Sequence, residues 1–278
     1  MNQILFKKPL TTDIVQFEIE APRIAKRWKA GQFLILRPHP HNERIPLTLV
    51  DGNPERGSIT IVVQAIGKTT RELAEMEVGE YVADVVGPLG EPATIEYVGR
   101  VLCVGGGVGV AELLPVARAF KEAGNYVTAI CGARTSSLII LDEELRACCD
   151  EVLWSTDDGS NGFKGTVVDL MKAWNRRDGL AAAHVIGPIP MMKYASLLTK
   201  EWGVPTYASV NPIMIDGTGM CGGCRVTVGG KVRFACVEGP EFDAHQVDFD
   251  ELARRNRAYV AHERKRLEEH LCRIGLGQ

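Results

Sequence analysis

Three cysteines and one aspartate in the last third of the chain carry the side-chain chemistry of a soft metal centre. They lie in the stretch DGTGMCGGCRVTVGGKVRFAC, which runs from Asp216 to Cys236 with the spacing Asp-x4-Cys-x2-Cys-x11-Cys. Thiolates suit zinc and iron–sulfur clusters rather than calcium or magnesium. Structural zinc sites usually pair two cysteine knuckles, or cysteines with histidines, and no histidine lies between residues 216 and 236.

The spacing favours an iron–sulfur cluster over zinc. Plant-type ferredoxins hold [2Fe–2S] through Cys-x4-Cys-x2-Cys and a distant fourth cysteine, and Asp216 occupies the first of these positions. Four glycines between residues 217 and 223 would let backbone N–H groups approach the sulfides closely. We therefore predict a [2Fe–2S] site whose ligands are Asp216, Cys221, Cys224 and Cys236. Structural zinc and a metal-free loop are the alternatives, and an aspartate before a glycine is also a common turn residue.

The composition limits the other functions that the chain can have. Its 278 residues, 45% hydrophobic and 24% charged, suffice for two globular domains, and the net charge of −3 excludes a strongly basic nucleic-acid surface. No apolar run approaches the roughly 20 residues of a membrane span, and the first residues lack a signal-peptide pattern. We expect a cytoplasmic protein with no nucleic-acid or membrane partner, in which disulfides are rare. Five further cysteines are interpreted mainly as small buried hydrophobic residues: Cys103, Cys131, Cys148, Cys149 and Cys272.

Residues 1–97 are predicted to form a small antiparallel β-barrel. The stretches VQFEIEA, QFLILRP, SITIVVQAI and YVADVVGP are rich in β-branched residues and are bounded by Gly, Pro or Asn. Several strands at this spacing are typical of a barrel. Only Thr70–Met76 has a short helical pattern.

Residues 98–205 alternate between strands and helices, which predicts a parallel α/β domain. Val101–Val104 is a buried-strand pattern, Ala111–Ala123 has helical spacing, and Gly124 is placed to end that helix. Further strands are expected at Val127–Cys131, Val152–Ser155 and His184–Ile186. Residues 206–240 then form the cysteine-bearing unit. Residues 241–278 form a C-terminal segment in which Asp248–Arg273 is expected to be one amphipathic helix.

Three short segments have the composition of cofactor-binding loops. GGGVGV (Gly105–Val110) follows a strand and opens a helix, a context in which a helix N-terminus attracts phosphate. A bare strand–helix connection is the alternative for this segment. RIPLTL (Arg44–Leu49) offers a fixed positive charge and a hydroxyl, and GKTTREL (Gly67–Leu73) is a glycine turn entering a short helix. Each of these two could equally be ordinary barrel rim.

The order of these parts resembles the ferredoxin–NADP⁺ reductase superfamily. Within it, the layout is similar to the electron-transfer subunit of dihydroorotate dehydrogenase, and more so to the small subunit of NADH-dependent ferredoxin:NADP⁺ oxidoreductases, which are electron-bifurcating transhydrogenases. The resemblance covers nearly the whole chain. It rests most on TDDGSNGFKGTVVDL (Thr156–Leu170), IGPIPMMK (Ile186–Lys193) and DGTGMCGGCRV (Asp216–Val226). Many superfamily members have Cys-Gly-Pro where this chain has Ile-Gly-Pro, so a thiol beside the nicotinamide is not expected.

The resemblance implies a role for each matching residue. FAD would be held by Arg44, Pro46, Leu47 and Thr48, with Thr48 near the isoalloxazine, and its pyrophosphate by Gly67, Thr69 and Thr70. The dinucleotide would face Gly106, Gly107 and Gly109, and the nicotinamide cofactor would be lined by Asp157, Asp158 and Gly187.

The resemblance also implies the chemistry and the partners. Electrons would pass between NAD(H), FAD and the [2Fe–2S] cluster, with no acid–base pair required, because the cofactors carry the reaction. The partner would be a larger flavoprotein subunit with its own FAD and [4Fe–4S] clusters. The complex would exchange electrons with ferredoxin through this subunit. The alternatives are a subunit of a dihydroorotate or sulfide dehydrogenase and a non-enzymatic, zinc-bearing assembly module. The sequence does not separate NAD from NADP, since Arg134 could meet a 2′-phosphate.

Overall fold

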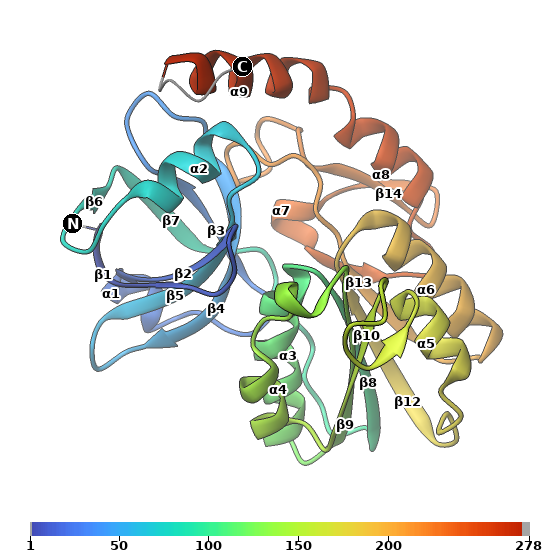
Figure 1. Cartoon of the computed structure of the whole chain (residues 1–278). Coiled ribbons are helices and arrows are strands. Elements are labelled where there is room, and N and C mark those ends of the chain that lie inside the picture. Colours follow the sequence, from blue (N-terminus) through green and yellow to red (C-terminus); the bar gives the residue numbers. More distant parts are fainter. Residues whose placement is uncertain (1, 274–278) are drawn as a thin grey trace.

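The computed structural model describes residues 2–273 and divides most of them between a β-barrel and an α/β layer (Figure 1). The barrel sheet has the strand order β6-β1-β2-β5-β4-β3-β7, and the pairs between its strands are antiparallel. Its strands are β1 (Asn2–Pro9), β2 (Ile14–Glu20), β3 (Phe33–Arg37), β4 (Ile45–Asn53), β5 (Ser58–Gln64), β6 (Tyr81–Val82) and β7 (Asp84–Leu89). The two edge strands, β6 and β7, are consecutive parts of one extended segment, so the sheet curls until its ends meet. The predicted antiparallel barrel is confirmed.

The barrel interior is filled by the alternating apolar residues that mark its strands. Phe17, Ile19 and Ile61 are completely buried there. Two short helices, α1 (Pro22–Ala25) and α2 (Lys68–Glu75), flank the barrel. The glycine that precedes α2, Gly67, is its N-cap.

The second sheet has the order β11-β10-β9-β8-β12-β13-β16, and all of its pairs are parallel except β13 with β16. Its strands are β8 (Arg100–Gly106), β9 (Tyr126–Ala133), β10 (Glu151–Thr156), β11 (Phe163–Lys164), β12 (Leu180–Ile186), β13 (Thr206–Ser209) and β16 (Glu241–Asp243). Chain order runs outward from β8 in one direction and from β12 in the other. The sheet therefore has a topological switch point between these two strands, where open α/β sheets bind ligands.

Helices cover both faces of this sheet (Figure 1). The helices are α3 (Gly109–Glu122), α4 (Asp142–Cys148), α5 (Val167–Ala173) and α6 (Ile189–Glu201), with a 3₁₀ turn at Ser136–Leu138. Gly124 follows the C-cap of α3 with φ +92°, the left-handed conformation that ends helices and that glycine adopts without strain. The predicted α/β domain and its helix stop are confirmed.

The cysteine-bearing unit is a two-stranded hairpin with a short helix. Strands β14 (Arg225–Val228) and β15 (Lys231–Phe234) pair antiparallel, and α7 (Ala235–Glu238) follows. Its buried cysteines, Cys224 and Cys236, share a hydrophobic core with the sheet and with Phe33 and Ile35 of the barrel. One core therefore joins all three parts.

The prediction of one continuous helix over Asp248–Arg273 is wrong. The structure has two helices, α8 (Phe249–Asn256) and α9 (Val260–Arg273). The Asn256 side chain at the end of α8 donates to the carbonyl of Asn211, and the chain turns at residues 257–259. Because of this break, α8 packs on α6 whereas α9 crosses to α2 beside the barrel (Figure 1). The last part of the predicted C-terminal segment, residues 274–278, lies outside the described residues.

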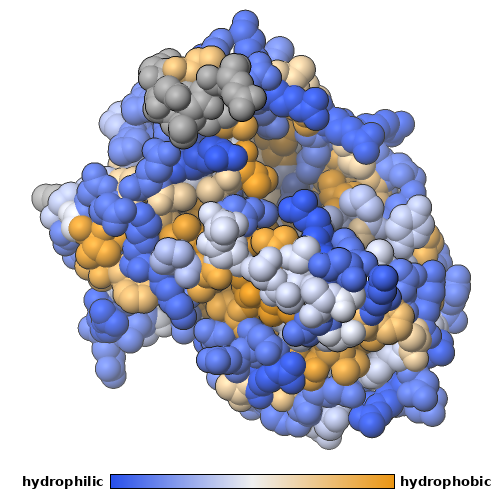
Figure 2. Space-filling view, viewed as in Figure 1, coloured by the Kyte–Doolittle hydropathy of each residue, from blue (hydrophilic) through white to orange (hydrophobic). Residues whose placement is uncertain are grey.

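None of the helices within residues 2–273 combines the length and the apolar character needed to cross a bilayer. On the face shown in Figure 2, hydrophobic residues gather in the middle, where the barrel meets the α/β layer, and hydrophilic residues cover most of the periphery.

Candidate functional site

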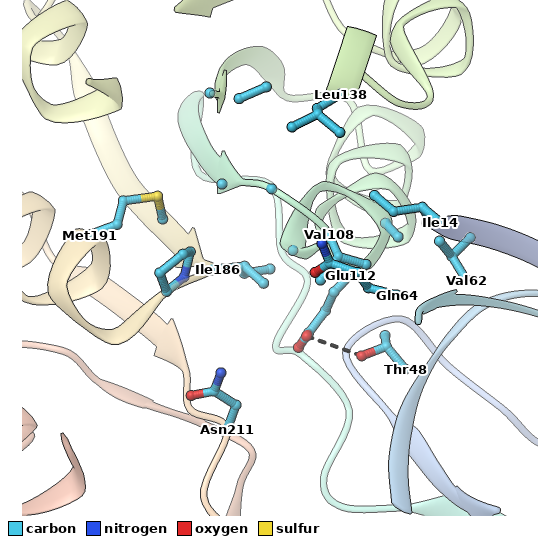
Figure 3. Close-up of a pocket in the computed structure, with 18 of the residues that line it drawn as sticks. Ile14, Thr48, Val62, Gln64, Val108, Glu112, Leu138, Ile186, Met191 and Asn211 are labelled. Atoms are coloured by element: carbon cyan, nitrogen blue, oxygen red, sulfur yellow. Dashed lines mark hydrogen bonds between the residues drawn. The ribbon is translucent and has the colours of Figure 1, made fainter. Parts of the chain in front are cut away.

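A cavity of about 680 Å³ lies between the barrel and the α/β sheet (Figure 3). Its barrel wall includes Ile14, Val62 and Gln64, and its opposite wall is formed by the carboxyl ends of β8, β9 and β12 and by the first turn of α3. This volume is in the range of cofactor and small-molecule sites. The cavity also lies at the topological switch point, so its position and its size both fit a ligand site.

The glycines of the predicted dinucleotide turn line this cavity. Gly106, Gly107, Gly109 and Gly187 all face it. A Cβ on Gly109 would lie 2.8 Å from the Gly187 Cα, and a Cβ on Gly106 would lie 2.4 Å from the Met191 sulfur. Glycines at these positions therefore let α3 and the end of β12 approach each other closely. The N-terminus of α3 is left open to the cavity, where its N–H groups can meet an anion.

The barrel contributes Pro46, Leu47 and Thr48 of β4 and Thr70 of α2 to the cavity wall. The Thr70 hydroxyl accepts hydrogen bonds from the backbone N–H groups of Ile66 and Gly67, which fixes the turn into α2.

Three of the residues predicted to hold FAD do not line the cavity. Arg44 is exposed just before β4, Gly67 is partly buried, and Thr69 is buried. Within residues 2–273, no ion pair neutralises Arg44.

The two predicted acidic residues after β10 separate in the structure. Asp157 lines the cavity, whereas Asp158 is exposed outside it and accepts hydrogen bonds from the backbone and hydroxyl of Ser160. These bonds hold the pKa of Asp158 below its usual range. Asp158 thus shapes the turn and Asp157 faces the ligand space. Arg134, which follows β9, also lines the cavity.

Sequence reasoning missed Glu112 of α3, a partly buried acidic residue in the cavity wall. Its carboxylate accepts a hydrogen bond from the Thr48 hydroxyl at 3.1 Å (Figure 3) and another from the Ser209 hydroxyl. Burial raises the pKa of Glu112 to about 7, while these hydrogen bonds oppose the shift. The only sequence signal was an acidic residue in the first turn of a helix, which usually indicates a solvent-exposed residue.

The predicted metal ligands lie on one loop and hairpin beside the barrel. The sulfur atoms of Cys224 and Cys236 are 3.2 Å apart and both residues are buried, whereas Cys221 is exposed. The Asp216 carboxylate accepts the backbone N–H groups of Thr218, at 3.0 Å, and Cys221, at 2.8 Å. These bonds lower the pKa of Asp216, so it is ionised as a ligand must be.

Across residues 2–273, no three His, Cys, Asp or Glu side chains are arranged as a metal site, so the structure brings two of the four predicted ligands together. The donor set nevertheless fits an iron–sulfur cluster. Three thiols and a carboxylate occur within 21 residues, and Gly217, Gly219 and Gly222 have positive φ, which lets the loop curve tightly. The 3.2 Å separation of the two buried sulfurs is far longer than a disulfide bond.

Strand β3 lies beside both the cavity and the cysteine loop. Ile35 of β3 pairs with Pro46, which lines the cavity. On the loop side, a Cβ on Gly217 would lie 2.9 Å from a side-chain carbon of Ile35. The loop backbone therefore packs directly on the strand that adjoins the cavity wall. Groups bound at the two places would therefore lie close to each other beside this strand.

Comparison with known proteins identifies the relatives of this chain. Residues 211–248 match the family of iron–sulfur cluster binding domains of dihydroorotate dehydrogenase B. A Thermotoga maritima homolog of the dihydroorotate dehydrogenase B (NAD(+)) electron transfer subunit is 47% identical over 275 residues, which is 99% of this chain and 97% of the relative.

Solved structures show the same fold. A chain of the NADH-dependent reduced ferredoxin-NADP oxidoreductase, studied for flavin-based electron bifurcation, superposes with a TM-score of 0.93 at 47% identity, covering 98% of both chains. The cytochrome b5 reductase domain of Ulva prolifera nitrate reductase shares the fold alone, with a TM-score of 0.58 and 20% identity over 70% of this chain and 88% of that one. The chain belongs to the family of dihydroorotate dehydrogenase B electron-transfer subunits.

Proposed function

We propose that this chain is the electron-transfer subunit of a complex that couples NADH, NADP(H) and ferredoxin by flavin-based electron bifurcation. When bound, FAD accepts an electron pair from NADH and releases single electrons, and a [2Fe–2S] cluster carries one electron at a time. The observation that carries the proposal is the adjacency of the two places: the cavity wall and the cysteine loop both adjoin β3. The 47% identity to a chain of the ferredoxin-NADP oxidoreductase supports it.

The FAD would be held on the barrel side of the cavity. Pro46, Leu47 and Thr48 would lie against its ring system, with the Thr48 hydroxyl as the polar contact. Arg44 would reach the pyrophosphate from the mouth, and Gly67, Thr69 and Thr70 would present the start of α2 to it. A helix N-terminus and a fixed guanidinium are both suited to a phosphate.

The pyridine nucleotide would enter from the sheet side. Gly106, Gly107 and Gly109 would let its phosphates approach the start of α3, and Gly187 would leave room for the nicotinamide. Asp157 and Asp158 would border the same space. We propose NAD(H) as this ligand, in keeping with the nucleotide named for both relatives, NAD(+) for one and NADH for the other.

The cluster would be bound by Asp216, Cys221, Cys224 and Cys236. Among residues 2–273 only Cys224 and Cys236 of these four lie together, so Asp216 and Cys221 would have to approach them on binding. A carboxylate in place of a fourth thiolate would change the charge and donor strength at the cluster, and with them its potential.

The partner that receives these electrons would be a larger flavoprotein subunit with its own FAD and [4Fe–4S] clusters, forming a heterodimer in the cytoplasm. Large apolar side chains flank the cysteine loop and are exposed: Ile215 at 52%, Met220 at 89% and Val237 at 44%. Such a patch beside the cluster supports a protein docking face there.

A second candidate is the electron-transfer subunit of a dihydroorotate dehydrogenase, favoured by the match of residues 211–248. This second candidate has another partner subunit and another final substrate, but the roles of the flavin, nucleotide and cluster sites in this chain are the same. The larger subunit that co-purifies with this chain would separate the two candidates.

The experiment is a comparison of acceptors for the purified, cofactor-loaded chain. We expect NADH to reduce an artificial one-electron dye slowly and to leave ferredoxin oxidised. The reason is that NADH is too weak a donor for a low-potential ferredoxin: each 30 mV by which its two-electron potential falls short costs about 1.4 kcal/mol. Ferredoxin reduction should appear only with the co-expressed larger flavoprotein and both pyridine nucleotides. Rapid ferredoxin reduction by the chain alone would contradict the subunit assignment. Dependence on dihydroorotate would favour the second candidate.

A further inference from the structure

Glu112 is a partly buried carboxylate placed where the barrel meets the α/β layer. It belongs to the first turn of α3, yet its two oxygens accept hydrogen bonds from Thr48 of β4 and from Ser209 at the end of β13. Both hydroxyl-bearing residues also line the cavity. Glu112 thus connects three elements at the cavity wall, beside the residue that we place near the flavin ring.

No cation compensates this carboxylate among the described residues. The acidic groups on the elements around α3 have their own partners: Asp51 of β4 pairs with Arg118, Asp142 of α4 pairs with Arg146, and Glu241 of β16 pairs with His184. The neighbouring strands β8 and β9 present the buried thiols Cys103 and Cys131, and burial raises their pKa values, so both are neutral. The charge that acts on Glu112 is the like charge of Glu241, which disfavours ionisation.

The protonation of Glu112 is therefore balanced near neutral pH. Burial raises the pKa of Glu112 to about 7, against the hydrogen bonds from Ser209 and Thr48 that stabilise the carboxylate. A nearby negative charge would raise this pKa further. Such a charge arises in the cavity when a bound cofactor gains electrons.

We propose that Glu112 is a positioning residue for the flavin, which holds the Thr48 hydroxyl toward the ring and takes up one proton when the flavin is reduced. This inference rests on the proposed function, since it requires FAD against Thr48. The electron pair comes from NADH and the proton comes from solvent. The Glu112 carboxylate becomes a carboxylic acid, and it forms no bond to the flavin. The proton offsets part of the charge that reduction adds to a buried cavity.

The test is the pH dependence of the flavin midpoint potential in the FAD-loaded chain, measured by spectroelectrochemical titration between pH 5.5 and 9. Above about pH 7 the Glu112 carboxylate is ionised before the flavin is reduced. In the pH range that begins there, reduction of the native chain should take up one more proton per electron pair than reduction of the Glu112→Gln variant. The matched control is Glu122→Gln, the same substitution at an exposed position of the same helix, which should behave as the native chain does. Identical profiles for the native chain and Glu112→Gln would overturn the inference.

A second variant keeps the test decisive if Glu112→Gln fails to fold or to hold FAD. Ser209→Ala removes a hydrogen bond that favours the ionised carboxylate, so the pH range in which reduction takes up the extra proton should begin at a higher pH. An unchanged pH range in Ser209→Ala would also overturn the inference. A native chain that binds no FAD would instead refute the proposed function, whereas normal FAD binding with no extra proton would refute only the role of Glu112.

Discussion

Gly109→Ala should weaken both the fold and nucleotide binding, because the added methyl group has no room. Its Cβ would lie 2.8 Å from the Gly187 Cα and 2.8 Å from the Ile186 carbonyl oxygen, where contacts of 3.4 Å or more are ordinary. Both neighbours are backbone atoms, so a side-chain rotation cannot relieve the clash. The first turn of α3 must move about 0.6 Å from the end of β12, which is the difference between 3.4 and 2.8 Å.

The expected magnitude follows from this displacement. Overpacking of this kind costs about 1–3 kcal/mol, of which the better helix propensity of alanine offsets up to about 1 kcal/mol. The same movement misplaces the N–H groups at the start of α3. Loss of one charge-assisted hydrogen bond to a phosphate, about 1.5–3 kcal/mol, would weaken NAD(H) binding by roughly tenfold to a hundredfold.

The assay combines a denaturant midpoint with an NADH titration of the FAD-loaded chain. Gly107→Ala is the control for the stability measurement, because a Cβ on Gly107 meets no atom within 4 Å and only its φ of +57° is unfavourable to alanine. We expect Gly107→Ala to lose about 1 kcal/mol from its backbone conformation and to retain the close approach of α3 to β12. Native nucleotide affinity and native stability in Gly109→Ala would refute the close-packing argument.

Three further changes test the rest of the site. Arg44→Ala should lower FAD affinity by one to two decades, because a charge-assisted contact to the pyrophosphate contributes about 1.5–3 kcal/mol; unchanged flavin content after gel filtration would count against this contact. Asp216→Ala should weaken retention of the cluster and Asp216→Cys should keep the cluster but change its potential and EPR spectrum, so unaltered iron content and spectrum in Asp216→Ala would show that Asp216 is not a ligand. Glu112→Gln should remove a pH dependence of stability. The pKa of Glu112 rises from 4.5 to about 7 on folding, so its stabilising effect is complete below pH 4.5 and is lost as the pH rises through 7. The free energy of unfolding lost in this way is at most about 3 kcal/mol. A difference between the denaturant midpoints of the native chain and Glu112→Gln that stays constant from pH 5 to pH 8 would contradict this assignment.

Local patterns predicted the parts of this protein that depend on local chemistry. The glycine turn between β8 and α3 and the stop at Gly124 are each contained within a few residues, and the cysteine spacing is contained within 21. The alternation of strands and helices also predicted the parallel sheet, because that topology follows from the order of elements.

Long-range contacts explain what the sequence did not predict. Glu112 is buried by Thr48 and Ser209, which lie 64 and 97 residues away in the chain. The break between α8 and α9 coincides with a contact from Asn256 to Asn211, 45 residues distant. The separation of Asp157 from Asp158 depends on which side of one turn faces the barrel. The periodicity of the sequence contains no information on any of these contacts.

The central claim is that electrons pass from NADH through a flavin in the cavity to a cluster on the cysteine loop. The most direct measurement is an anaerobic NADH titration of the cofactor-loaded chain, followed by flavin absorbance and by EPR. We expect the flavin to bleach and a [2Fe–2S] signal of about one spin per chain to appear. In Cys224→Ser the flavin should still bleach, but the signal should be absent. A native chain that carries zinc in place of iron, or whose flavin bleaches while a loaded cluster stays oxidised, would contradict the account.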